Sequence, residues 1–218
     1  MLALSATLLP AASKNKERLA EATVVLHEVM SSPDKGIPHD LLHKAECVVV
    51  VPGLKKGAFI IGARYGKGYV SCRRSGGRGW SAPATIRVEG GSVGFQIGAT
   101  ETDVVLLVMN SSGADKLMKS KFTVGGAAQA AAGPVGRTAT AETDALMRAE
   151  ILSYSRARGL FAGVSLEGAT LREDLDANKA MYRLPLTTKE IVRDAKAKPT
   201  AAGGKFIAAL TKYSPKGS

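Results

Sequence analysis

Hydrophobic residues near the start of the chain recur at helical spacing. Between residues 14 and 30, apolar side chains return every three or four positions, and charged side chains occupy the positions between them. This pattern predicts an amphipathic helix, whose buried face would consist of Leu19, Ala22, Val25, Leu26 and Val29. A short second helix is expected over residues 39–45, because the missing N–H of Pro38 costs nothing in a first turn.

The spacing then becomes that of strands. A continuous run of β-branched residues over 47–51 ends at Pro52-Gly53 and predicts a buried strand. Glycines such as Gly66 are expected to form turns between the strands that follow. These strands are predicted over residues 58–63, 68–73, 84–88, 92–99, 103–109, 122–124, 145–158 and 159–166. Short strands at this spacing indicate an α+β domain, with an antiparallel β-rich sandwich or partly closed barrel and flanking N- and C-terminal helices.

Further helices are expected at three places, over residues 112–120, 171–182 and 187–198. Thr187 or Thr188 can cap the last of these, with Glu190 near the cap. The Ala/Gly-rich stretch over 125–143 predicts no clear element. We therefore expect one main domain over residues 14–186, followed by a basic helical and mobile tail over residues 187–218.

The N-terminal residues 1–13 are apolar and end in small side chains. They resemble the later part of a secretory signal peptide, although the usual basic start is missing. The alternative is an apolar N-terminus that frays. No apolar run reaches the ~20 residues that span a bilayer. A signal-peptide remnant would place the protein in the periplasm or outside the cell, with peripheral membrane association.

The charge of the chain narrows the classes of partner that it could bind. Lys and Arg number 30 against 19 Asp and Glu, a net charge of +11 that favours lipid head groups, nucleic acid or an acidic protein. Aromatic residues are only 5% of the chain, which disfavours a nucleic-acid stacking platform. Cys47 and Cys72 form no CxxC pair, so a zinc site made of cysteines is excluded. They are either two buried thiols or one disulfide.

Two motifs that would suggest catalysis are incomplete. His39 and His43 have zinc-protease spacing, but Asp40 stands where the longer Glu is needed. Residues 90–94 match G-x-S-x-G, yet the positions around Ser92 alternate as in a strand and do not form a strand-to-helix elbow. We expect no catalytic residue, no metal and no cofactor.

Basic residues gather between the first and fourth predicted strands. From Lys55 to Glu89, Glu89 is the single acidic residue. Held together on hairpins, they could bind phosphate groups, and Trp80 beside them could enter a lipid interface. The alternatives are a solvated basic face and a Trp80 that fills the core. The candidate lipid-binding residues are Lys55, Lys56, Arg64, Lys67, Arg73, Arg74, Arg78, Trp80 and Arg87.

Several segments in series resemble the SYLF (Ysc84-like) domain family over about residues 15–185. They are residues 37–45, 47–73, 79–83, 90–110, 132–137 and 153–168. The resemblance implies a lipid-binding, β-rich domain, with actin binding in fungal members. Phosphoinositide binding in eukaryotic relatives is attributed to basic, amphipathic N-terminal parts. Here the 14–30 helix carries as many acids as bases, which departs from that pattern. The cysteine positions resemble the bacterial, exported branch, where actin would not be the partner.

These observations lead to two hypotheses. The first is non-enzymatic binding of anionic, phosphoinositide-like phospholipid head groups at a membrane surface, through the basic residues named above. The second is a structural or protein-interaction module of the cell envelope without a specific small ligand.

Overall fold

The computed structural model describes residues 8–31, 36–58, 61–74, 79–93, 98–126, 129–136, 148–157 and 160–215. Several parts of the sequence predictions lie outside these residues, among them positions 1–7, the candidate Arg78, the middle of the strand expected over 92–99, the first residues of the strand expected over 145–158, and about half of the 125–143 stretch.

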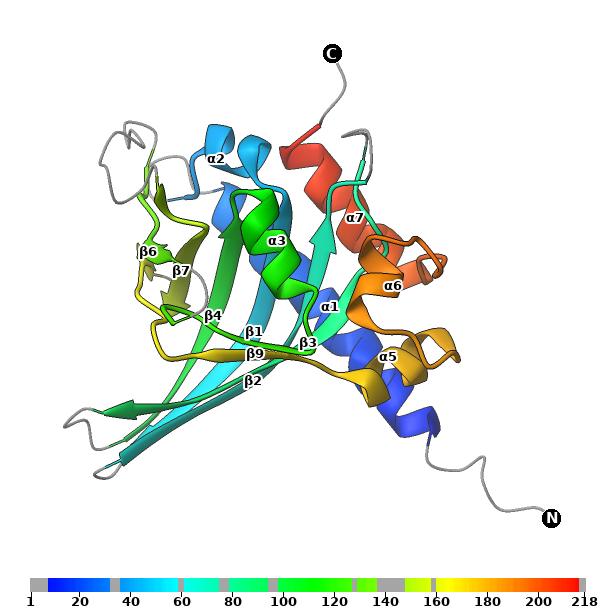
Figure 1. Ribbon diagram of the computed structural model, residues 1–218, viewed down its shortest axis with the longest axis horizontal. Coiled ribbons are helices and arrows are strands. Elements are labelled where there is room, and N and C mark those ends of the chain that lie inside the picture. The colour runs from blue at the N-terminus through cyan, green and yellow to red at the C-terminus, as the bar shows by residue number, and fades with distance from the viewer. Residues whose placement is uncertain are drawn as a thin grey trace.

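The strands form one curled sheet, a half-barrel (Figure 1). Its order is β5-β9-β3-β2-β1-β4-β7-β6, with β8 also paired to β7, and every pairing except β6–β7 is antiparallel. The predicted α+β class and partly closed barrel are confirmed. The strands are β1 (Cys47–Ala58), β2 (Ile61–Cys72), β3 (Ala84–Val93), β4 (Gly98–Val108), β5 (Lys121–Thr123), β6 (Ala130–Ala132), β7 (Ile151–Ala157), β8 (Leu160–Gly163) and β9 (Thr170–Glu173).

Helices flank the sheet as predicted. They are α1 (Leu8–Ser31), α2 (His39–Lys44), α3 (Ser111–Leu117), α5 (Leu175–Tyr182), α6 (Thr188–Val192) and α7 (Ala201–Tyr213). One core lies between the sheet and α1, α2 and α7, on what we call the helix face. A second core lies on the opposite, inner face, where β5, β9, α3 and α6 contribute side chains.

Two long strands replace the shorter ones predicted around the first hairpin. Pro52-Gly53 does not end β1 but forms a bulge, where the pairing register shifts between Val51 and Leu54 and Gly53 adopts a φ of 59°. Gly66 does not form a turn, because it lies within β2. A Cβ there would come within 2.7 Å of Leu54 Cδ1, so glycine makes room for the bulged strand.

The strand predicted over 92–99 is wrong as a single element. Ser92 and Val93 end β3, whereas Gly98 and Ala99 begin β4, and the β1–β2 hairpin lies between these two strands in the sheet. The helix predicted over 171–182 begins late. Residues 171–173 belong to β9, and the Asp174 side chain caps α5 by accepting a hydrogen bond from the Ala177 N–H.

The segment over 187–218, expected to be a basic, helical and mobile tail, contains helices α6 and α7. Thr187 and Glu190 form the expected capping box of α6. Beyond it, α7 packs against α1 with Phe206 and Leu210 fully buried, so this segment is part of the helix-face core.

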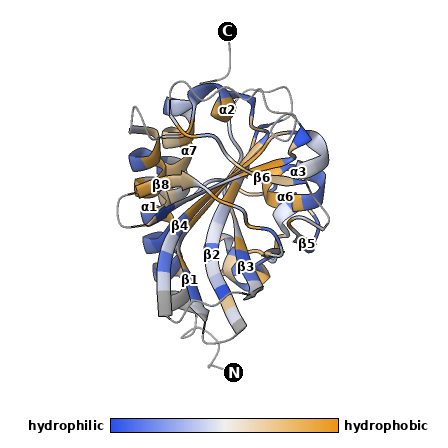
Figure 2. Ribbon diagram, turned by 90° about the vertical axis from the view of Figure 1, so that its left-hand side faces the viewer, coloured by the Kyte–Doolittle hydropathy of each residue, from blue (hydrophilic) through white to orange (hydrophobic). Residues whose placement is uncertain are grey.

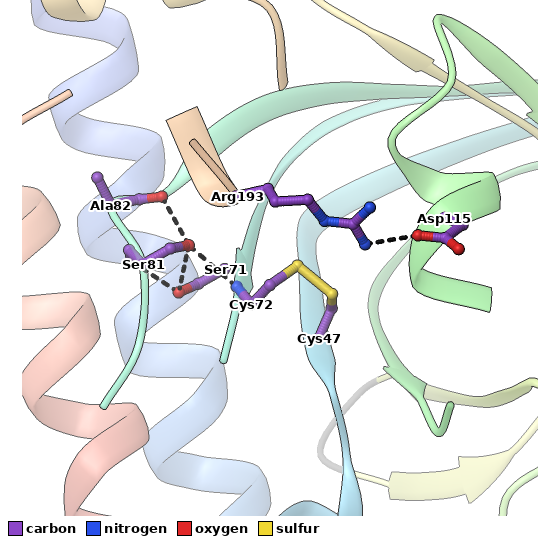
Figure 3. Close-up of a disulfide and its surroundings, with 7 residues drawn as sticks. All are labelled: Cys47, Ser71, Cys72, Ser81, Ala82, Asp115 and Arg193. Atoms are coloured by element: carbon purple, nitrogen blue, oxygen red, sulfur yellow. Dashed lines mark hydrogen bonds and ion pairs between the residues drawn. A yellow bond between two sulfur atoms is a disulfide. The ribbon is translucent and has the colours of Figure 1, made fainter. Parts of the chain in front are cut away.

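Cys47 and Cys72 form a disulfide, which settles the question left open by the sequence. They stand directly opposite each other on β1 and β2. Figure 3 shows the bridge beside Ser71 and Ser81, where the Ser81 hydroxyl accepts a hydrogen bond from the Cys72 N–H at 3.1 Å. The bridge joins residues 25 positions apart, at the end of the hairpin nearest α2.

Candidate functional site

The fold disperses the basic residues named from the sequence. Lys56 and Arg64 lie on the inner face of the sheet, whereas Lys55, Lys67 and Arg87 lie on the helix face. A third group, Arg73, Arg74 and Trp80, lies at the other end of β2. The described candidates therefore do not form one basic surface.

Trp80 and Arg73 lie in the protein interior, in line with the alternative in which Trp80 fills the core. Trp80 is 1% exposed and Arg73 is 8% exposed. The Arg73 guanidinium stacks on the Trp80 ring at 3.9 Å and donates hydrogen bonds to the carbonyl and hydroxyl oxygens of Ser214. Burial is the main cause that lowers the pKa of Arg73, with Glu46 opposing it. Arg73 thus fastens the end of α7 to the sheet.

The helix-face cations are largely neutralised. Lys67 pairs with Asp174 at 2.7 Å, and Arg87 and Arg172 both pair with Glu89, at 3.8 and 3.3 Å. These three cations share two carboxylates, so about one net positive charge remains for an external anion. Lys55 differs, because it is exposed and stands between Tyr65 and Glu101 in the strand register, with no ion pair among the described residues.

Lys56 and Arg64 form a like-charged pair. They are direct cross-strand partners on β1 and β2 and point to the same face, a placement that normally destabilises a sheet. Neither makes an ion pair within the part of the chain that the structure describes. Burial lowers the pKa of Lys56, the charge of Arg64 lowers it further, and burial also lowers the pKa of Arg64.

The Arg64 guanidinium has unused hydrogen-bond donors. Its Nε and Nη1 are buried and have no partner among the described residues. On neighbouring β4, Thr102 faces the same side, and its buried hydroxyl is equally unpartnered. The segments that join β1 to β2 and β3 to β4, residues 59–60 and 94–97, contain no Asp or Glu. Positively charged donors that have no acidic partner among the described residues are suited to an anionic oxygen ligand.

One edge of this site is bounded by glycine. Gly90 of β3 lies opposite Arg64, and a Cβ on it would approach Gly168 O at 3.1 Å and Arg64 Cγ at 3.6 Å. The Arg64 stem therefore lies close to the loop that precedes β9. Both cations were among the candidates from the sequence, but they could not be distinguished from the neighbouring basic residues. The distinction depends on which face of the sheet each side chain takes.

A second hollow lies at the other end of the inner face. This cavity of about 330 Å³ is lined by Asn110, Lys116, Gly125, Gly126, Gln129, Arg148 and Glu150. Burial alone would raise the pKa of Glu150, but hydrogen bonds from Lys116, Ser112 and the Gln129 N–H lower it overall. The carboxylate is therefore already saturated by protein donors and has little capacity left for a ligand.

The residues considered for catalysis do not converge. His43 contacts the Ser214 hydroxyl at 3.4 Å, whereas Ser92 belongs to β3, on another element. No cluster of three metal-ligating side chains occurs among the described residues. None of the described helices is long and apolar enough to cross a membrane.

The fold and site define an α+β half-barrel domain with terminal helices packed on one face. Residues 89–213, more than half of the chain, match the family model described as "Ysc84: Las17-binding protein actin regulator". The chain belongs to this Ysc84 (SYLF) family.

Three relatives illustrate the match. The chain is 39% identical to an SH3 domain-containing protein of Schizosaccharomyces pombe, covering 76% of this chain and 39% of the relative. It is 32% identical to the human SH3 domain-containing YSC84-like protein 1, over 88% of this chain and 58% of the relative. It is 36% identical to LAS seventeen-binding protein 3 of Saccharomyces cerevisiae, over 73% of this chain and 35% of the relative. The chain thus spans roughly a third to three fifths of the length of these relatives, two of which are named for an SH3 domain and one as a binding protein.

Proposed function

We propose that this domain is a non-enzymatic module that binds anionic, phosphoinositide-like phospholipid head groups at a membrane surface, through Lys56 and Arg64. The observation that carries the proposal is the like-charged pair itself. These two partly buried cations face each other, and neither forms an ion pair with a carboxylate among the described residues. Two N–H groups of the Arg64 guanidinium also lack acceptors there. A phosphate group beside them would relieve the repulsion, and a small rotation of the Arg64 side chain would let it accept those hydrogen bonds.

The expected strength follows from the charges. A basic side chain near an anionic bilayer contributes roughly 1 kcal/mol. The pair would contribute about 2 kcal/mol, which corresponds to about thirtyfold in affinity. Lys55 and the net charge of +11 add a weaker, screened attraction. This supports reversible, peripheral attachment.

The disulfide supports a location. Disulfides persist in oxidising compartments, and Cys47–Cys72 is buried on the sheet. A periplasmic or secreted protein, peripherally attached to a membrane, is consistent with this bridge.

Vesicle co-sedimentation at low salt tests the proposal, with the anionic phospholipid fraction increased stepwise. We expect binding to rise with that fraction, and Lys56→Met/Arg64→Met to lose about thirtyfold in partition coefficient. The control is Lys119→Met/Lys205→Met, which removes two exposed charges elsewhere and should lose less than about threefold. Absence of wild-type binding at the highest anionic fraction would overturn the proposal, and equal losses in both variants would remove the pair from it.

The names of the relatives favour a second candidate, a protein-interaction module. The family description and the yeast relative both refer to Las17 binding, and the family is described as an actin regulator. Co-sedimentation with actin filaments, and pull-down with purified Las17, would test this in the absence of lipid. Binding to either protein that survives Lys56→Met/Arg64→Met, with vesicles ignored, would favour this candidate over the first.

A further inference from the structure

The far ends of four strands project beyond the rest of the sheet. Among the described residues, β4 has lost its β7 partner before Asp103, and β3 has no β9 partner after Glu89. Figure 1 shows these ends of β1, β2, β3 and β4 extending away from the helices. We call this projecting part the paddle. Its described residues are 54–58, 61–66, 90–93 and 98–102.

The paddle is polar where the sheet behind it is apolar. In Figure 2 the strands change from orange near α2 to blue and white toward their far ends. Cations lie on both of its faces: Lys56 and Arg64 on the inner face, and Lys55 on the helix face beside Tyr65, which is 48% exposed. A flat membrane contact through one face would leave the cations of the other face in water.

Helix α1 is a poor alternative for membrane contact. Its apolar face is already buried in the helix-face core, with Leu19, Ala22 and Leu26 fully inaccessible. Its exposed side carries both acids and bases, such as Lys16, Glu17 and Glu21. Val24, at 53% exposure, is the large apolar side chain that it presents to solvent among the described residues.

We propose that the paddle enters the head-group layer of an anionic bilayer end-on, so that both of its faces contact lipid. This rests on the proposed function and adds the orientation of the domain. Five residues of strand measure about 16 Å, whereas the head-group layer is about 5–8 Å deep on each side. The paddle is therefore long enough to cross that layer while the helices stay outside it. Tyr65 is suited to the interface, because a ring with a polar tip prefers that depth.

Tryptophan probes on the full chain test the orientation. Tyr65→Trp places a probe on the helix face of the paddle, and Thr100→Trp places one on the inner face, where Thr100 is exposed. Val24→Trp is the control on α1. The native Trp80 is buried and provides a constant background that also reports folding. The readout is quenching by brominated phospholipid in anionic vesicles, relative to the wild type.

End-on entry predicts quenching of both paddle probes and none of Val24→Trp beyond the wild type. Quenching of one paddle probe alone would show flat docking and overturn the inference. Quenching of Val24→Trp alone would assign the contact to α1 and overturn it too. Vesicle binding without quenching at either paddle probe would reject entry of the paddle into the head-group layer, whereas the proposed function would remain. Failure of the wild type to sediment would reject both.

Discussion

Lys56 and Arg64 are two cations that the fold brings together at a cost. Like charges at directly opposite strand positions repel each other, and partial burial removes water that would screen them. Residues kept in an unfavourable arrangement are more often found at functional sites than in the framework of a fold. The repulsion at this pair is the reason to expect a negatively charged ligand there.

The pH dependence of stability should reveal this repulsion. Burial first, and Arg64 second, lower the pKa of Lys56 below the ordinary value of 10.5. At a pH between the lowered pKa of the folded state and the ordinary pKa of the unfolded state, the folded state binds fewer protons than the unfolded state. The free energy of unfolding therefore rises with pH in this range. The penalty is fully present below the folded pKa and is gone above 10.5. Urea titrations of wild type and Lys56→Met, from about pH 8 upward, should give curves that converge. A difference in the free energy of unfolding between the two proteins that does not change with pH would contradict this repulsion.

Arg73 has the opposite role, because its charge is used inside the protein. Arg73→Met removes two hydrogen bonds to Ser214 and the contact with Trp80. We expect a loss of about 2 kcal/mol in the free energy of unfolding, with unchanged vesicle binding by the folded protein. Denaturant unfolding and vesicle sedimentation measure the two effects, with the exposed Lys44→Met as control. Weaker vesicle binding at full stability would return Arg73 to the lipid site.

At the scale of elements, locally determined features were predictable. The helix over 14–30 and the Thr187–Glu190 capping box depend on residues within a few positions of each other, and both are present. Long-range features were not. Strand β9 forms because residues 170–173 pair with β3, more than eighty positions earlier. Helix α7 forms because Phe206 and Leu210 pack against α1, which outweighs the low helix propensity of Gly203-Gly204.

The bulge at Pro52-Gly53 explains why the site could not be located from the sequence. Side chains alternate between faces along a strand, so one extra residue exchanges the faces of everything beyond it. Val51 and Leu54 both face the inner core, and therefore Lys56, and not Lys55, joins Arg64 there. The residue types were visible in the sequence, but the face of each depends on a bulge whose Pro-Gly pair resembles a turn.

Phe206→Ala tests whether α7 is part of the core. The side chain is fully buried, and removing a buried aromatic ring costs about 3–5 kcal/mol. Chemical denaturation should show this loss, whereas the exposed neighbour substitution Lys205→Ala should change stability by less than about 0.5 kcal/mol. Equal stability of the two variants would mean that α7 does not pack as described.

At the scale of the whole molecule, the helices and the candidate site occupy different parts. Helices α1 and α7 complete the core on the helix face, and the inner face is filled near α3 and β9. The far part of the β1–β4 ribbon extends past most of both cores, and Lys56 and Arg64 lie there on its inner face. This separation lets one end of the domain adapt to an anionic surface while the packed body supplies stability.

The most direct test measures stability and binding together. Wild type and Lys56→Met/Arg64→Met are unfolded with denaturant, each with and without a soluble short-chain anionic phospholipid such as dihexanoyl phosphatidic acid. Without lipid, the variant should be at least as stable as the wild type, because the repulsion is gone. With lipid at about ten times its dissociation constant, the wild type should gain about 1.4 kcal/mol and the variant almost nothing. A variant that is less stable than the wild type and gains equally from lipid would contradict a ligand site at Lys56 and Arg64.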